Sequence, residues 1–138
     1  LKAKYTSSYL DEAKPVGSEL TPGVRVEAVT VPDSLDWGDK GGISLIQDQG
    51  TNCVAGWAFA SVAAAETMTY LGNRTIGFFS EEYVLECTSG GSCKGGDLLA
   101  GMKLMLKNGA PPRLLYPYTA DSSTTPKTSG ICDKTWNL

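Results

Sequence analysis

The chain has 138 residues, of which 41% are hydrophobic, and this is enough for one domain of ordinary size with a packed core. Twelve Lys and Arg residues against fifteen Asp and Glu residues give a net charge of −3, a balance that excludes the basic surface of a nucleic-acid-binding domain. The longest apolar run, from Val54 to Ala65, contains Ser61 and is shorter than the roughly 20 residues that a membrane-spanning helix needs. We therefore expect no direct membrane span.

Residues 1–30 differ in composition from the rest of the chain. They carry two of the seven prolines and scattered charges, and they show little hydrophobic periodicity after Leu10. This pattern predicts a tail or linker, followed by a domain over residues 31–138.

The first predicted helix begins at Ala55 or Gly56 and runs to about Tyr70. It is rich in alanine, and a helix that is apolar on most sides is usually buried. Gly72 is predicted to end it, because glycine is common just after the last helical turn. The residues that give this helix more than one apolar face are Trp57, Phe59, Ala60, Ala63, Ala64 and Met68.

Two further helices follow. Ser80 is predicted to cap a helix from Glu81 to about Cys87, and we interpret Glu81 and Glu82 as acids that stabilise its N-terminus rather than as catalytic groups. Asp97 opens a helix over 98–108 that Gly109 ends. Its apolar stripe consists of Leu98, Met102, Met105 and Leu106. Residues 119–131, rich in Ser, Thr and Pro, predict a surface loop.

The chain has four cysteines, at positions 53, 87, 93 and 132, and no histidine. Without a CxxC pair or a histidine, a zinc site is a poor fit, so we expect two disulfides, no metal and no cofactor. Four cysteines allow three pairings, and spacing does not choose between them. Disulfides predict an oxidising compartment, and the glycosylation sequon Asn73-Arg74-Thr75 agrees with a secretory route.

The most informative stretch is residues 48–60, DQGTNCVAGWAFA. The signature around the nucleophilic cysteine of papain and the cathepsins is C-G-[SA]-C-[WY]. Laid on residues 53–57, it puts Gly56 where the attacking thiol belongs. Upstream, Asp36-Trp37 and Gln49-Gly50 resemble the lead-in DWR..G.V..VKNQG; downstream, residues 57–60 resemble WAFS. The chain thus resembles the papain-like, cathepsin L-like cysteine peptidase family over roughly residues 31–132. It departs from the family by one extra residue, Thr51 or Asn52, and by Val54 in place of glycine.

The resemblance implies an α+β papain-like fold, of which this chain is mainly the helical left-hand domain with two disulfides. The family places its catalytic His and Asn about 130–150 residues after the nucleophile, and fewer residues than that follow Gly56. We therefore expect the β-rich second domain to be absent from the chain. Residues 1–30 are similar to the end of a family propeptide, which implies a path along the substrate cleft beside Gly95 and Gly96.

A disulfide pairing also follows from the resemblance. SEEYVLEC, ending at Cys87, is similar to the family's SEQ.LVDC, and Cys93 with its Lys-Gly-Gly is similar to CNGG. Cys132 follows Tyr-Pro-Tyr at 116–118 as a cysteine follows YPY in the family. These matches imply that Cys53 pairs with Cys93 and that Cys87 pairs with Cys132.

The site residues are carried over in the same way. In the family, the side-chain amide at the position of Gln49 and the backbone N–H at the position of Gly56 stabilise the oxyanion, with Trp57 adjacent. Gly95 and Gly96 would pair with extended substrate, and Leu98 would line a specificity pocket. A plain glycine turn beside a disulfide, and a plain core leucine, are the competing interpretations.

Three hypotheses about function follow. The chain is an inactive papain-like homologue with a binding or structural role; or it is an inactivated form or fragment of an active papain-like endopeptidase, with Cys replaced by Gly; or it is a disulfide-stapled interaction domain. The expected partners are a peptide or protein in the cleft, or a histidine-bearing C-terminal half. The expected localisation is the secretory pathway, in a lysosome, a vacuole or the extracellular space.

Overall fold

The computed structural model describes residues 32–119 and 130–136. It divides the chain into two units, Leu1–Ser34 and Leu35–Leu138. Within the described residues, the second unit is helical, contains two disulfides and has no extended strand. The predicted tail at 1–30, its path along the cleft, and most of the predicted loop at 119–131 lie outside the described residues.

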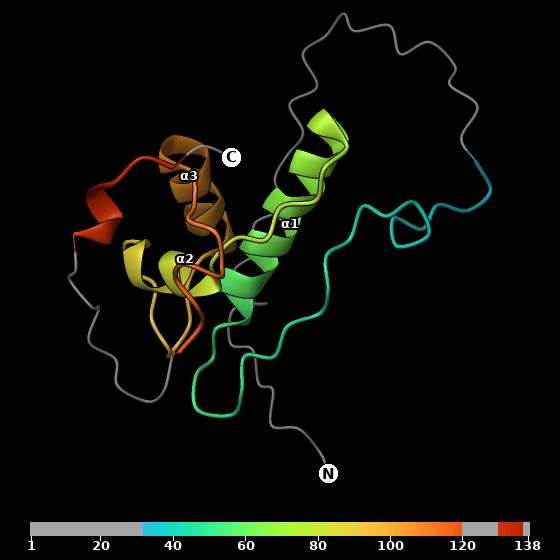
Figure 1. The fold of residues 1–138 in the computed structure, drawn as a ribbon. Coiled ribbons are helices and arrows are strands. Elements are labelled where there is room, and N and C mark those ends of the chain that lie inside the picture. The colour runs from blue at the N-terminus through green and yellow to red at the C-terminus, as the bar shows by residue number, and fades with distance from the viewer. Residues whose placement is uncertain (1–31, 120–129, 137–138) are drawn as a thin grey trace, which may run out of the picture. The chain divides into compact units, whose positions relative to one another are not determined.

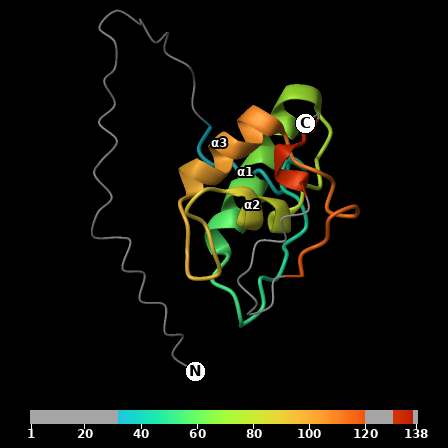
Figure 2. The same cartoon turned by 90° about the vertical axis from the view of Figure 1, so that its left-hand side faces the viewer.

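Helix α1, Gly56–Asn73, lies beside both α2 and α3 (Figure 1, Figure 2). It begins where the sequence predicts but continues past Tyr70. The prediction that Gly72 ends it is wrong, because Gly72 lies inside the helix. Arg74 caps α1 instead: it adopts the left-handed conformation, with φ 62°, and donates its N–H to Tyr70 O at 2.8 Å.

The prediction that α1 is buried on most sides fails for this chain. The side chains of Ala60, Ala63 and Met68 are exposed. The buried side of the helix consists of Ala58, Ser61, Val62 and Glu66. An apolar part of α1 therefore stays uncovered by the described residues.

Helix α2, Glu81–Cys87, is short and almost completely buried. Its predicted cap is confirmed, because Ser80 Oγ accepts a hydrogen bond from the Tyr83 N–H at 3.0 Å. The interpretation of Glu81 and Glu82 as plain N-terminal acids is too simple. They are only 2% and 3% exposed, and both bind groups far away in the sequence.

Helix α3, Leu98–Asn108, has the predicted ends. Asp97 accepts a hydrogen bond from the Leu99 N–H at 3.0 Å, and Gly109 follows with φ 72°. Met105 is 1% exposed and belongs to the core, whereas Leu106 is 81% exposed. The core-facing stripe is thus narrower than predicted. A short 3-10 helix, η1, covers Ile131–Asp133.

Helices α1 and α3 approach each other closely at Gly101. A Cβ atom at this position would lie 2.5 Å from Ser61 Oγ and 3.1 Å from Val84 Cγ1, so only glycine fits without a shift. The Ser61 hydroxyl lies within hydrogen-bond distance of Trp57 O, at 2.9 Å, and of Leu98 O, at 3.0 Å. This contact fixes the start of α3 against α1.

Two disulfides tie the loops to this helical core. Cys53 is joined to Cys93 and Cys87 to Cys132, the pairing that the resemblance implies. The sequence separations are 40 and 45, and loops of this length correspond to about 4 kcal/mol of stabilisation each in the chain-entropy model. The first disulfide holds the segment before α1 against the loop that follows α2.

Candidate functional site

The N-terminus of α1 and the side chain of Gln49 converge at one point. Gly56 is the first residue of α1 and is exposed. The N–H groups in the first turn of a helix have no intrahelical acceptor, so they present a positive field at this end. Gln49 Oε1 lies 3.5 Å from the place where a Cβ of residue 56 would stand. The side-chain amide of Gln49 is therefore next to residue 56, with its oxygen, an acceptor, on the near side.

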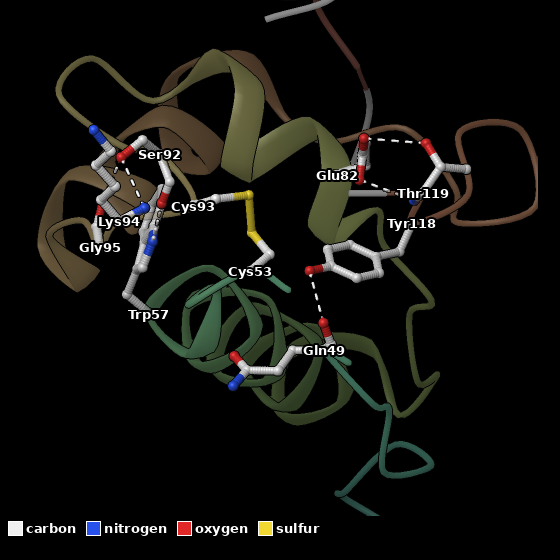
Figure 3. Close-up of a disulfide and its surroundings, with 10 residues drawn as sticks. All are labelled: Gln49, Cys53, Trp57, Glu82, Ser92, Cys93, Lys94, Gly95, Tyr118 and Thr119. Atoms are coloured by element: carbon white, nitrogen blue, oxygen red, sulfur yellow. Dashed lines mark hydrogen bonds between the residues drawn. A yellow bond between two sulfur atoms is a disulfide. The ribbon is translucent and has the colours of Figure 1, made fainter. Parts of the chain in front are cut away.

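Tyr118 holds the backbone of Gln49 in place (Figure 3). Its hydroxyl donates a hydrogen bond to Gln49 O at 3.1 Å, and its ring makes an edge-to-face contact with Phe59 at a centroid distance of 4.9 Å. Burial raises the pKa of Tyr118, and nearby carboxylates such as Glu82 raise it further, so the phenol stays a donor. Gln49 Oε1 is itself buried and accepts no hydrogen bond from the described residues.

The disulfide between Cys53 and Cys93 fixes the approach to α1 (Figure 3). Cys53 is 2% exposed, and the next residue, Val54, donates its N–H to Cys93 O at 2.9 Å. The covalent bond and the hydrogen bond together leave the segment between Gln49 and Gly56 little freedom. The geometry at residue 56 is therefore set by the loop around Cys93 as much as by the helix.

Trp57 is packed into the glycine-rich loop around Cys93. A Cβ on Gly91 or on Gly96 would lie 2.4 Å from its indole ring. The indole Nε1–H points to Ser92 O at 3.4 Å (Figure 3). Gly91 and Gly96 are thus required by packing against Trp57, which is a reason for glycine that the sequence pattern alone did not give.

Gly95 and Leu98 are placed differently from Gly96. The N–H and C=O of Gly95 both form hydrogen bonds with Ser92, at 3.1 and 2.9 Å, so its N–H is already used within the turn. Leu98 is the first residue of α3, is 40% exposed and provides the carbonyl that Ser61 contacts. Asn73 lies at the other end of α1, about 25 Å from Gly56 along the helix axis, and does not belong to this site.

The sequence reasoning missed a buried ionic cluster between α1 and α2. Arg113 Nε and Nη2 donate to Glu81 at 2.9 and 2.5 Å, and Nη2 lies 3.5 Å from Glu66 Oε1. Glu66 also accepts hydrogen bonds from the Phe79 N–H, at 2.8 Å, and from Ser44 Oγ. An acid within the apolar α1 sequence was the available signal, since a buried carboxylate needs partners.

Residues 32–119 and 130–136 contain no metal site, membrane-spanning helix or free thiol. No three acidic or cysteine side chains there are placed to hold a metal ion. No helix in this part of the chain has the length and apolarity to cross a membrane. All four cysteines are paired, so no free thiol accompanies Gly56.

The sequence profile described as "Papain family cysteine protease" matches residues 31–137. The chain belongs to the papain family. Ananain of Ananas comosus is 31% identical over 132 residues, and the cathepsin L-like proteinase of Fasciola hepatica is 31% identical over 122 residues. These alignments cover 93% and 85% of this chain.

A solved papain-family structure shares the fold of this chain. The bromelain protease from Ananas comosus, in complex with the E64 inhibitor, matches with a TM-score of 0.63 and 35% identity, over 72% of this chain and 46% of the bromelain chain. The chain spans 38% of the length of ananain and 37% of that of the Fasciola proteinase. It thus has the helical part of the papain-like fold and less than half the length of these relatives.

Proposed function

We propose that this papain-family chain holds an extended peptide or protein without hydrolysing it. The observation that carries the proposal is Gly56: at the point where the N-terminus of α1 and the Gln49 side chain converge, the chain has no nucleophile. A cysteine peptidase attacks with a thiolate, and glycine has no side chain that could replace it.

The remaining groups do not compensate for this absence. Gln49 and the N–H of Gly56 can stabilise an oxyanion only after an attack has taken place. The four cysteines are all engaged in disulfides, and a histidine base or acid would have to come from outside these 138 residues. In the alternative hypothesis, the chain is an inactivated form of an active endopeptidase. It also lacks a thiol at residue 56, and the two hypotheses differ only in how Gly56 arose.

The peptide would lie along the loop around Cys93. Gly95 uses its N–H inside the turn with Ser92, but a Cβ there would meet no atom within 4 Å, so this side of the loop is open to an extended ligand. Gly96, whose Cβ position faces the Trp57 ring, would offer its backbone groups to the ligand. Pairing of backbone groups with an extended segment gives affinity that does not depend on catalysis. Leu98, 40% exposed at the start of α3, would contribute an apolar contact.

A second half of the fold is the proposed protein partner. A hollow of about 290 Å³ lies between residues 43–47 and one side of α1, where Phe59, Ala60 and Ala63 line it. Leu45 and Ile46 beside it are 76% and 97% exposed. Apolar side chains exposed next to one another are typical of an interface. A histidine-bearing C-terminal half would cover this surface, and the disulfides suit a secretory, lysosomal, vacuolar or extracellular setting.

The test restores the thiol. In the full chain, Gly56→Cys should react quickly with iodoacetamide at neutral pH, because the helix N-terminus lowers the thiol pKa. Ala60→Cys, exposed one turn further along α1, is the matched control and should react more slowly. Neither variant should cleave a fluorogenic peptide with Leu or Phe at the second residue before the scissile bond. Cleavage by the unchanged chain would overturn the proposal.

Adding a histidine-bearing C-terminal half from a relative distinguishes the binding homologue from the inactivated endopeptidase. If Gly56→Cys is active only when this half is added, the missing thiol at residue 56 is the main cause of inactivity, and the rest of the site is complete. Binding of the peptide by the unchanged chain, measured by fluorescence anisotropy and weakened by Leu98→Glu at an exposed position, supports a binding role. Equal binding by Leu98→Glu contradicts the proposed position of the peptide.

A further inference from the structure

An apolar groove lies between the C-terminal halves of α1 and α3. Its volume is about 480 Å³, and its walls are formed by Met68 and Gly72 from α1 and by Met102, Met105 and Leu106 from α3. Met68 is 62% exposed and Leu106 is 81% exposed. A group of exposed apolar side chains of this kind indicates a surface that another group covers.

The groove offers few polar groups to a partner. Thr69, which also lines it, donates its hydroxyl to Ala65 O within its own helix at 2.9 Å. Gly72 leaves the groove open, because a Cβ there would meet no atom within 4 Å. The polar side chain that remains on the lining is Asn73, the last residue of α1.

Asn73 begins the sequon Asn73-Arg74-Thr75, in which all three residues are exposed. The Thr75 N–H donates to Asn73 Oδ1 at 2.9 Å. This bond uses the amide oxygen and not Nδ2, the atom to which a glycan attaches. Because Arg74 turns the backbone at the end of α1, the sequon stands on a bend at the edge of the groove.

We propose that Asn73 carries an N-linked glycan and that this glycan covers the groove between α1 and α3. Nδ2 forms the bond to C1 of a sugar carried on a polyprenyl diphosphate. The C1–O bond to the diphosphate breaks, its electron pair leaves with the diphosphate, and the amide nitrogen loses one proton. The glycan is bulky and solubilising, and it is anchored on the lining itself.

Three observations support the glycan as the occupant. Its anchor, Asn73, belongs to the groove, so the first sugars stay next to Met68 and Leu106 without any binding equilibrium. The two disulfides indicate an oxidising route, on which sequons are read. The groove lies at the end of α1 opposite Gly56, so a glycan there leaves the candidate functional site open.

The first experiment tests the modification. The full chain is secreted from a eukaryotic host behind a leader peptide, and the peptide that contains Asn73 is analysed by mass spectrometry. We expect a glycan, released by peptide N-glycosidase, which is lost in Asn73→Gln and Thr75→Ala and kept in Thr75→Ser. An unmodified Asn73 in the secreted chain overturns the proposal.

The second experiment tests the covering. The folded, glycosylated chain is treated with the glycosidase without denaturant, so that folding does not depend on a variant. We expect greater fluorescence of an apolar dye and a shift toward self-association in gel filtration. Leu106→Lys in the same deglycosylated chain should reverse both changes, whereas Leu114→Lys should not, because Leu114 is at least as exposed but lies outside the groove lining. No change on deglycosylation overturns the covering role.

Discussion

Arg113 and Glu81 form a two-point ion pair between the segment after α3 and the start of α2, with N···O distances of 2.9 and 2.5 Å. The carboxylate of Glu81 is almost completely buried, and the same guanidinium lies 3.5 Å from the buried Glu66. One cation thus compensates two buried acids. The position of α2 relative to α1 depends on this cation, because both helices contribute one acid to it.

Arg113→Met should therefore destabilise the chain strongly. It leaves two buried carboxylates without a cation, and breaking a buried pair costs about 3–5 kcal/mol. The free energy of unfolding, measured by urea titration, should fall by that order. Lys103→Met removes one positive charge from an exposed position on α3 and is the matched control. Equal losses in the two variants would show that the Arg113 pair contributes nothing specific.

Glu66 gives a prediction about pH. Burial raises the pKa of its carboxyl above the ordinary value of 4.5, and the hydrogen bonds from Ser44 and Phe79 and the charge of Arg113 offset part of the rise. The folded-state pKa lies above the unfolded-state pKa, so the folded chain binds more protons between the two values. The contribution of Glu66 to the free energy of unfolding is therefore largest below the unfolded-state pKa and falls as pH rises through the folded-state pKa.

Glu66→Gln removes this pH dependence. The free energy of unfolding of the unchanged chain, minus that of Glu66→Gln, should decrease as pH rises from about 4.5 toward neutrality. Ser44→Ala should extend the decrease to higher pH, because it removes the hydrogen bond that lowers the Glu66 pKa most. Denaturant titrations at a series of pH values measure both. A difference that rises with pH would contradict the assignment.

Much of the fold could be predicted because its signals are local. Ser80 and Asp97 cap the helices that they precede, and the cysteine pairing follows from a motif register that places each cysteine against a known neighbour. The position of Gly56 at the start of α1 also follows from that register. These features depend on a few adjacent residues, so the sequence contains them directly.

The features that were missed depend on residues far apart in the chain. Arg113 has no local pattern that assigns it to Glu81 and Glu66, which come from two different helices. Gly72 carries the local signal of a helix end, but α1 continues through it to Asn73. Leu106 fits the apolar stripe predicted for the helix over 98–108, but its side chain is exposed on the groove, because none of the described residues packs on that side of α3.

Gly96→Ala tests the packing of Trp57. The added Cβ would lie 2.4 Å from the indole, so the ring must move and its contact with Ser92 O must change. We expect the Trp57 indole N–H resonance, assigned with Trp57→Phe, to shift or disappear. Gly90→Ala is the control, since φ is +79° there but a Cβ would meet no neighbour. It should cost stability through backbone strain and leave the indole resonance in place.

Gly101 and Gly72 form a matched pair of helical glycines with opposite expected responses to alanine. Alanine stabilises a helix interior by about 1 kcal/mol relative to glycine, and at Gly72 the new Cβ meets nothing, so Gly72→Ala should raise the free energy of unfolding. At Gly101 the Cβ would meet Ser61 and Val84, and overpacking of a core costs about 1–3 kcal/mol, which opposes the helical gain. Gly101→Ala should therefore unfold at lower urea concentration than Gly72→Ala.

Ser61→Ala removes the atom nearest to the new Cβ at position 101. In a double-mutant cycle, the variant with both Gly101→Ala and Ser61→Ala should therefore lose less stability than the sum of the losses in the two single variants. Strict additivity, or a Gly101→Ala variant as stable as Gly72→Ala, would mean that α1 and α3 are not held together by this close contact.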